Sequence, residues 1–126
     1  MAEQQSLEIP GYPHVNPVPN GCKIGNIFYS SSIFGIDTAT GKRRETGEEQ
    51  VEQCFTNLRV LLTEAGGSPK NVVFLQVFLT SAMGDAVNRE WLKMFPDEKH
   101  RPARINLTQP ESESNPIRLQ CVAVLD

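Results

Sequence analysis

The chain has 126 residues, of which 39% are hydrophobic and 21% charged, values typical of a globular protein that buries its own core. The formal net charge is −3 and the isoelectric point about 5.4, which count against nucleic-acid binding because such proteins usually carry a basic face. We therefore expect one domain spanning residues 1–126 and a partner other than nucleic acid.

The cysteine and apolar patterns indicate a cellular compartment. Three cysteines occur without paired spacing, and the odd number predicts free thiols in a reducing environment. The first residues lack the basic-then-apolar pattern of a signal peptide, and no apolar run reaches the length of a membrane span. There are two histidines and no metal-ligand spacing. We expect a cytoplasmic protein without a metal or other cofactor.

The first third of the chain is rich in turn-forming residues. Residues 1–20 contain four prolines, which predict an extended, irregular arm rather than a packed element. Residues 22–32 contain two β-prone stretches around Gly25-Asn26, a pattern that predicts a hairpin. A polar, turn-rich loop is expected over residues 37–41.

The clearest helix pattern follows Thr46. Apolar side chains recur there at i, i+3, i+4 and i+7. Thr46 followed by Glu49 matches a capping box, and Gly66-Gly67 supplies a C-terminal stop. The side chains expected in the core are Val51, Cys54, Phe55, Leu58, Leu61, Leu62 and Ala65.

Four further elements are predicted after this helix. Residues 72–80 are rich in Val and Phe and predict a central strand covered on both faces. A second helix is expected over residues 83–95, ended by Pro96, with strands over residues 104–108 and 117–125. Alternation in the last strand puts Ile117, Leu119, Cys121, Ala123 and Leu125 on one face, and Arg118, Gln120, Val122 and Val124 on the other.

The element order β-β-α-β-α-β-β indicates a two-layer α+β domain, in which both helices pack on one face of a mixed sheet. Phe74, Phe78, Val122 and Val124 are expected on the opposite face, and no further helix is predicted to cover it. We therefore expect that face to pack against other copies of the chain in a closed homo-oligomer.

Two arginines stand where a strand should begin, in the stretch Arg101-Pro-Ala-Arg104. Pro102 restricts Arg101 to an extended conformation. An arginine anchored at a strand entrance can bind a carboxylate through two hydrogen bonds. On these residues alone, a solvent-exposed pair of arginines is the simpler interpretation.

Landmarks in a recognisable order extend over roughly residues 17–125, and the most specific is Pro102-Ala103-Arg104. The others are Phe28-Tyr-Ser30, Ser32-Ile33, Thr40-Gly41, Asn57-Leu58, Ala65-Gly66, Asn71-Val72-Val73, Asn88, Phe95-Pro96 and residues 117–123. In these residues the chain resembles the Rid (reactive intermediate deaminase) family, also known as YjgF-like or endoribonuclease L-PSP-like.

The resemblance implies a chorismate-mutase-like α+β fold that forms a homotrimer, with ligand sites in the clefts between subunits. It also implies that Arg104 binds the carboxylate of a small metabolite, and that the activity is hydrolysis of an enamine or imine to a 2-keto acid and ammonia. Such substrates are similar to 2-aminoacrylate or an aminomuconate. The reaction needs no cofactor, because a positioned water and one proton-transfer group are sufficient.

Several positions depart from the deaminating members of that family. The glutamate that positions or activates the water in those proteins corresponds to Gln120, and an amide cannot act as a base near neutral pH. Val18 stands in place of an arm tyrosine, Ser31-Ser32 in place of Gly-Gln, and Asn106 in place of a cysteine found in some members. The candidate catalytic residues are Gln120 and His100, and the candidate substrate-binding residues are Arg104, Asn106, Ser32 and Val18.

Each candidate has an alternative interpretation. Gln120 equally fits a buried amide that pairs between subunits, Asn106 a structural side chain, and His100 a solvated loop residue. Arg101 is expected to be an exposed or interface charge. For the whole protein, the alternatives are a carboxylate-binding protein without deaminase activity, which Gln120 favours, and RNA cleavage, which the acidic charge counts against.

Overall fold

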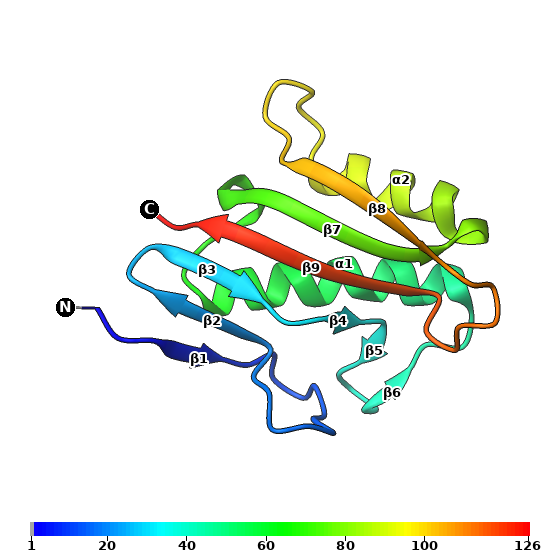
Figure 1. The fold of residues 1–126 in the computed structure, drawn as a ribbon, viewed down its shortest axis with the longest axis horizontal. Helices are drawn as coiled ribbons and strands as arrows, with labels where there is room; N and C mark the ends of the chain where they lie inside the picture. The colour runs from blue at the N-terminus through cyan, green and yellow to red at the C-terminus, as the bar shows by residue number, and fades with distance from the viewer. Residues whose placement is uncertain (1) are drawn as a thin grey trace.

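In Figure 1 the helices lie along one face of the main sheet. The structure is a computed structural model that describes residues 2–126. Its helices are α1 (Gly47–Glu64) and α2 (Gly84–Met94), with short 3-10 helices at Pro69–Asn71 and Ser81–Met83. Its strands are β1 (Gln5–Leu7), β2 (Gly21–Ile24), β3 (Ile27–Ser30), β4 (Ile33–Phe34), β5 (Ile36–Asp37), β6 (Lys42–Arg43), β7 (Val72–Thr80), β8 (Ala103–Gln109) and β9 (Ile117–Val124).

Within residues 2–126 the main sheet has seven strands in the order β1-β2-β3-β9-β7-β8, and β4 also pairs with β9. β7 and β8 are parallel and connected through α2, whereas the other pairs are antiparallel. β5 and β6 form a separate hairpin. This mixed sheet with its helix layer confirms the predicted α+β architecture. No helix in this range has both the length and the apolar character to cross a membrane.

The longer predicted elements are confirmed, and local residues explain where they begin and end. Thr46 Oγ1 accepts a hydrogen bond from Glu49 N at 3.1 Å, and Glu49 Oε1 accepts one from Thr46 N at 3.1 Å. This capping box starts α1. Beyond the helix, Gly66 adopts a φ of +86°, a left-handed conformation that favours glycine. The hairpin turns at Gly25, as predicted.

The N-terminal arm differs from the prediction. Gln5–Leu7 forms the edge strand β1 on β2, and Leu7 and Ile9 are buried in the core. Ile9 N donates to Asn20 Oδ1 at 2.8 Å, which closes the arm onto the sheet. The expectation of an irregular, unpacked arm was wrong for this part, because burial of Leu7 and Ile9 outweighs the effect of the nearby prolines. The short strands β4, β5 and β6 were not predicted either.

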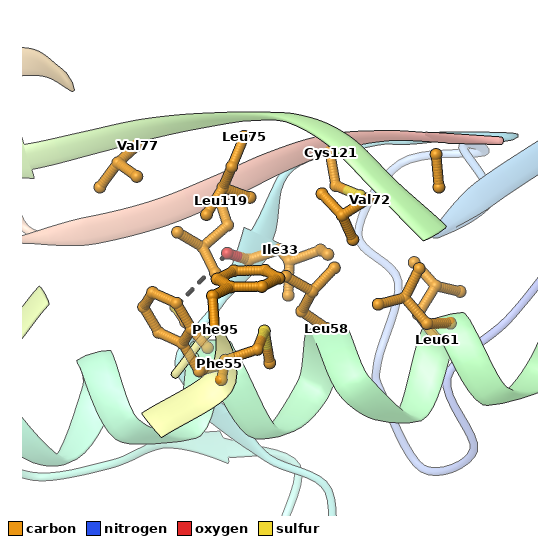
Figure 2. Packing of buried hydrophobic residues seen from close by; sticks show 14 of the residues in the cluster. Ile33, Phe55, Leu58, Leu61, Val72, Leu75, Val77, Phe95, Leu119 and Cys121 are labelled. Carbon is orange, nitrogen blue, oxygen red and sulfur yellow. Dashed lines mark hydrogen bonds between the residues drawn. The ribbon is translucent and has the colours of Figure 1, made fainter. Parts of the chain in front are cut away.

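The core lies between the helices and one face of the sheet. Figure 2 shows Leu75 of β7 and Leu119 of β9 directed toward Phe55 and Leu58 on the helix layer. The seven side chains expected in the core from the first helix are all buried, with Ala65 at the C-cap of α1, and so are the five alternating side chains from Ile117 to Leu125. The predicted 3.6-residue and two-residue periodicities therefore identify the two surfaces that meet here.

The opposite face of the sheet stays open in the single chain. Phe74 and Phe78 of β7 and Val122 of β9 are only half-buried, and Val124 is exposed. The prediction that residues 72–80 are covered on both faces is wrong for the single chain, because both helices pack on the same side. Burial of these side chains requires another molecule, which favours the expected self-association.

Candidate functional site

Arg104 lies on the helix side of the edge strand β8. In the parallel register it is opposite Leu75, a fully buried residue that faces the helices, and paired residues point to the same side of a sheet. Arg104 Nη2 donates to Asn88 Oδ1 at 2.9 Å, and its Cζ lies 4.8 Å from the centre of the Trp91 ring. Asn88 and Trp91 are three residues apart on α2, so both reach the same guanidinium.

One nitrogen of this guanidinium has no acceptor. Arg104 Nη1 is buried and makes no hydrogen bond within the part of the chain that the structure describes. Burial lowers the pKa of Arg104, yet a guanidinium remains charged at any pH at which proteins fold. A buried cationic N–H without an acceptor is costly, so this position favours an anionic oxygen from outside the chain.

Arg101, the other arginine of the stretch, has a structural role. Its side chain is exposed, as expected, but Nε donates to Phe95 O at 2.9 Å and Nη2 to Pro96 O at 3.4 Å. These two carbonyls follow the last residue of α2. Arg101 therefore closes the C-terminal end of the helix that carries Asn88 and Trp91, and a cation at that end is favourable.

Gln120 points to the open face of β9, away from Arg104. Its Nε2 donates to Ser30 O and to Cys121 O, both at 3.3 Å. Since both partners are carbonyl oxygens, the amide nitrogen has to face them, and Oε1 remains available as an acceptor. Cys121 itself is buried, and burial raises the pKa of its thiol to about 12, so the thiolate is absent near neutral pH.

Ser32 and Val18 come together at a pocket of about 410 Å³, which we call the arm pocket. It is lined by arm residues between positions 12 and 20 and by Ser31, Ser32, Phe34 and Ile36. Arg104, Gln120, Asn106 and His100 do not line it. The predicted substrate-binding residues are thus divided between the arm pocket and the Arg104 region.

Asn106 and His100 neither line the arm pocket nor take part in the contacts of Arg104 with Asn88 and Trp91. Asn106 pairs in register with Val77, so it is on the same side of β8 as Arg104, and its side chain is exposed. His100 has a side chain that is 79% exposed, and its Nδ1 lies 2.8 Å from Asp97 Oδ2. The pKa of Asp97 is lowered by the backbone N–H of Lys99 and then by His100. The roles of Asn106 and His100 remain predictions.

Three residues near these sites were not predicted as functional: Asn88, Trp91 and Arg118. Asn88 and Trp91 could have been found by their spacing on the predicted helix, but the sequence does not show which strand faces them. Arg118 shares its strand face with Gln120 and donates from Nη1 to Ser32 Oγ at 3.0 Å. Alternation along the last strand was the available signal for it.

Comparison with known proteins identifies the family. The family model described as endoribonuclease L-PSP matches residues 13–110. The chain belongs to this family. The resemblance to the endoribonuclease L-PSP-like, or Rid, proteins is therefore confirmed. The matched region contains Asn88, Trp91, Arg104 and all of the arm pocket except Tyr12, whereas Arg118 and Gln120 lie beyond its end.

Individual known proteins are similar to this chain over most of its length. Protein mmf1, mitochondrial, of Schizosaccharomyces pombe is 30% identical, with 98% of this chain and 78% of that protein covered. The 3-aminoacrylate deaminase RutC of Acinetobacter baylyi is 31% identical over 79% of this chain and 82% of its own length. The structure of RidA from a Psychrobacter species has a TM-score of 0.85 at 26% identity, covering 96% and 99% of the two chains. These matches confirm the expected fold.

Proposed function

We propose that this chain is a Rid-type hydrolase that deaminates a small, carboxylate-bearing enamine or imine and releases ammonia. The observation that carries the proposal is the buried Nη1 of Arg104, which has no acceptor within residues 2–126. Asn88 and Trp91 restrict the orientation of the guanidinium, and a small rotation of the side chain would expose the buried Nη1 to a carboxylate. Similarity to a 3-aminoacrylate deaminase supports the same reaction class.

The chemistry requires few protein groups. Water adds to the carbon of the C=N bond, and the resulting carbinolamine loses ammonia to leave a 2-keto acid. Arg104 would fix the carboxylate beside that carbon, and Gln120 Oε1 would accept a hydrogen bond from the attacking water. Because Gln120 cannot accept a proton, the water proton would pass directly to the substrate nitrogen or through another water.

A complete site of this kind would form between copies of the chain. Arg104 is on the helix side of the sheet and Gln120 on the open face. The open face presents Phe74, Phe78, Val122 and Val124 and is uncovered in one chain, which supports a homotrimer in which Arg104 of one copy meets Gln120 of another. In that arrangement Asn106 would accompany Arg104, while Ser32 and Val18 would accompany Gln120. A cytoplasmic location is part of the proposal.

The second candidate function is carboxylate binding without turnover. It is favoured by the position of the Gln120 amide, which two backbone carbonyls hold in one orientation. Gln120→Glu would place a carboxylate oxygen against those carbonyls, so the new side chain has to rotate or stay protonated. The substitution therefore creates a base only if the side chain turns away from Ser30.

Trp91 provides a direct test of the binding step, because it is the only tryptophan of the chain and lies 4.8 Å from Arg104. Titration with 2-oxobutyrate should change its fluorescence. In Arg104→Gln the affinity should fall about tenfold to a hundredfold, the contribution of charge-assisted hydrogen bonds. The control Arg59→Gln removes an exposed arginine of α1 and should bind like the wild type. Equal affinities of the Arg104 and Arg59 variants would exclude the carboxylate site.

Ammonia release separates the two candidate functions. The substrate is 2-aminoacrylate generated enzymatically in the assay, and the rate without protein is subtracted. A deaminase should accelerate release in proportion to its concentration, and Arg104→Gln should abolish the acceleration. If the wild type binds 2-oxobutyrate but gives no acceleration even at high protein concentration, the binding function is correct and the deaminase is not.

A further inference from the structure

We propose that Arg118 is a second anion-binding residue of the site, so that the ligand carries two acidic groups. This inference rests on the proposed function and narrows its substrate class to amino or imino dicarboxylic acids. One carboxylate would lie next to the reacting carbon and bind Arg104. The other would lie at the far end of the ligand and bind Arg118.

The position of Arg118 relates it to Gln120. The two residues are two apart on β9, so their side chains leave the same face of the sheet. Gln120 donates to Ser30 O, and Arg118 Nη1 donates to Ser32 Oγ at 3.0 Å. Both β9 side chains therefore contact the short segment of residues 30–32.

The ring of Phe78 packs against the guanidinium of Arg118. In the sheet register Arg118 lies between Phe78 of β7 and Phe34 of β4. Its Cζ is 3.9 Å from the centre of the Phe78 ring, close enough for a cation–π contact. This contact and the Ser32 hydrogen bond restrict the orientation of the side chain, and such preorganisation reduces the cost of binding an anion.

Arg118 has no carboxylate partner in the described part of the chain. None of the ion pairs found in residues 2–126 includes it, although Arg44 and Arg89 each pair with a glutamate. A guanidinium has five N–H donors, and Ser32 is the one acceptor that Arg118 finds in this part of the chain. The remaining donors can form the paired hydrogen bonds that arginine makes with a carboxylate.

The arm pocket adjoins this arginine. Ser32, which accepts from Arg118, and Phe34, its cross-strand neighbour, both line the pocket. A ligand that binds beside Gln120 would have to extend past Ser32 to reach Arg118, and the arm pocket lies on that side of Ser32. A monocarboxylate of the 2-aminoacrylate type has no second acidic group for Arg118 to bind. Arg118 therefore favours dicarboxylate ligands.

A matched pair of keto acids tests this proposal. 2-Oxoglutarate and 2-oxovalerate have the same carbon chain, but the first ends in a carboxylate and the second in a methyl group. We expect the wild type to bind 2-oxoglutarate at least about tenfold more tightly, measured by Trp91 fluorescence and calorimetry. Arg118→Gln should abolish this preference while its affinity for 2-oxovalerate stays within about twofold of the wild type. Arg59→Gln should retain the preference.

Other outcomes would overturn the proposal. One is that the wild type shows no preference for 2-oxoglutarate over 2-oxovalerate, and another is that Arg118→Gln weakens the binding of both keto acids equally. A third is that Arg118→Gln changes the oligomeric state but keeps the preference, as expected for an ion pair between copies. If Arg118→Gln dissociates the assembly, the neutral Arg118→Met, whose apolar side chain can still pack on Phe78, replaces it, and an unchanged preference in that variant overturns the proposal. Failure of the proposed function would look different, because neither keto acid would then bind or Arg104→Gln would weaken neither.

Discussion

Two arginines lie over aromatic rings on opposite faces of the sheet, in similar environments. Arg104 of β8 stacks on Trp91 and donates to Asn88, whereas Arg118 of β9 stacks on Phe78 and donates to Ser32. Neither has a carboxylate partner within residues 2–126. Their surroundings differ, because α2 buries one nitrogen of Arg104, while Arg118 stands beside Gln120 and the arm pocket. One chain thus carries two arginines without a carboxylate partner in residues 2–126 on opposite faces of the sheet, and in the proposed assembly they would meet between copies.

Mixing two inactive variants tests this separation and has the largest expected effect. Arg104→Gln lacks the carboxylate clamp, and Gln120→Leu lacks the water acceptor, so each alone should have almost no deaminase activity. If every site uses Arg104 from one copy and Gln120 from the next, random assembly of equal amounts leaves about a quarter of the sites intact. Joint refolding of the two variants should restore about that share of the wild-type rate of ammonia release.

The control for this experiment is to refold each variant separately and combine the products without exchange of subunits. Activity should then stay at the level of the single variants. A jointly refolded mixture that also stays at this level would show that Arg104 and Gln120 act within one chain or do not act together.

Substitutions on the two faces of β9 should also differ in their effect on the free energy of unfolding. Leu119 is fully buried against the helix layer, so Leu119→Ala should lower the free energy of unfolding by about 3 kcal/mol. Val122 is half-buried on the open face, and Val122→Ala should cost less than about 1 kcal/mol in the dissociated chain. If that face is an interface, the cost of Val122→Ala should grow with protein concentration, because assembly stabilises the folded state. Urea denaturation at two protein concentrations measures both effects.

A concentration-independent cost for Val122→Ala would contradict self-association through this face. Leu119→Ala is the matched control, since its cost comes from a cavity within one chain and should be present at either concentration. The comparison thus separates packing against the helices from packing against another copy.

The long elements could be predicted because their signals are local. The Thr46–Glu49 capping box and the spacing of Cys54 and Leu58 lie within one helix, and the alternation from Ile117 to Leu125 lies within one strand. The strand at Gln5–Leu7 could not be predicted, since its stability depends on pairing with β2, fourteen or more residues away in the sequence. Local proline content is a poor guide to such a pairing.

The candidate site was predictable only in part for the same reason. Arg104 could be proposed from the Pro-Ala-Arg motif, but its contacts with Asn88 and Trp91 depend on the parallel register of β7 and β8 and on where α2 crosses them. Alternation placed Arg118 on the same face as Gln120. Its stacking on Phe78 follows from a cross-strand register that no local pattern specifies.

Tyr12 connects the arm pocket to the sheet through its hydroxyl group. The Tyr12 hydroxyl accepts a hydrogen bond from Phe34 N at 2.9 Å. Tyr12→Phe leaves that backbone N–H without its acceptor and should lower the free energy of unfolding by about 1 kcal/mol at pH 7. Val15→Ala, at an arm position that is 96% exposed, is the matched control and should have no effect.

The cost of Tyr12→Phe should depend on pH. Burial raises the pKa of Tyr12 from 10.0 to about 12, so on raising the pH the unfolded chain loses this proton first. The stabilisation by Tyr12 is therefore fully present below pH 10 and decreases as the pH rises toward about 12. The stability difference between wild type and Tyr12→Phe should shrink over this range, while the contributions of the buried cysteines cancel because both proteins contain them. Urea denaturation at pH 7 and at pH 10.5 measures the change. A stability difference between wild type and Tyr12→Phe that is the same at both pH values would show that the Tyr12 hydroxyl is accessible to solvent and is not held in a buried hydrogen bond with Phe34.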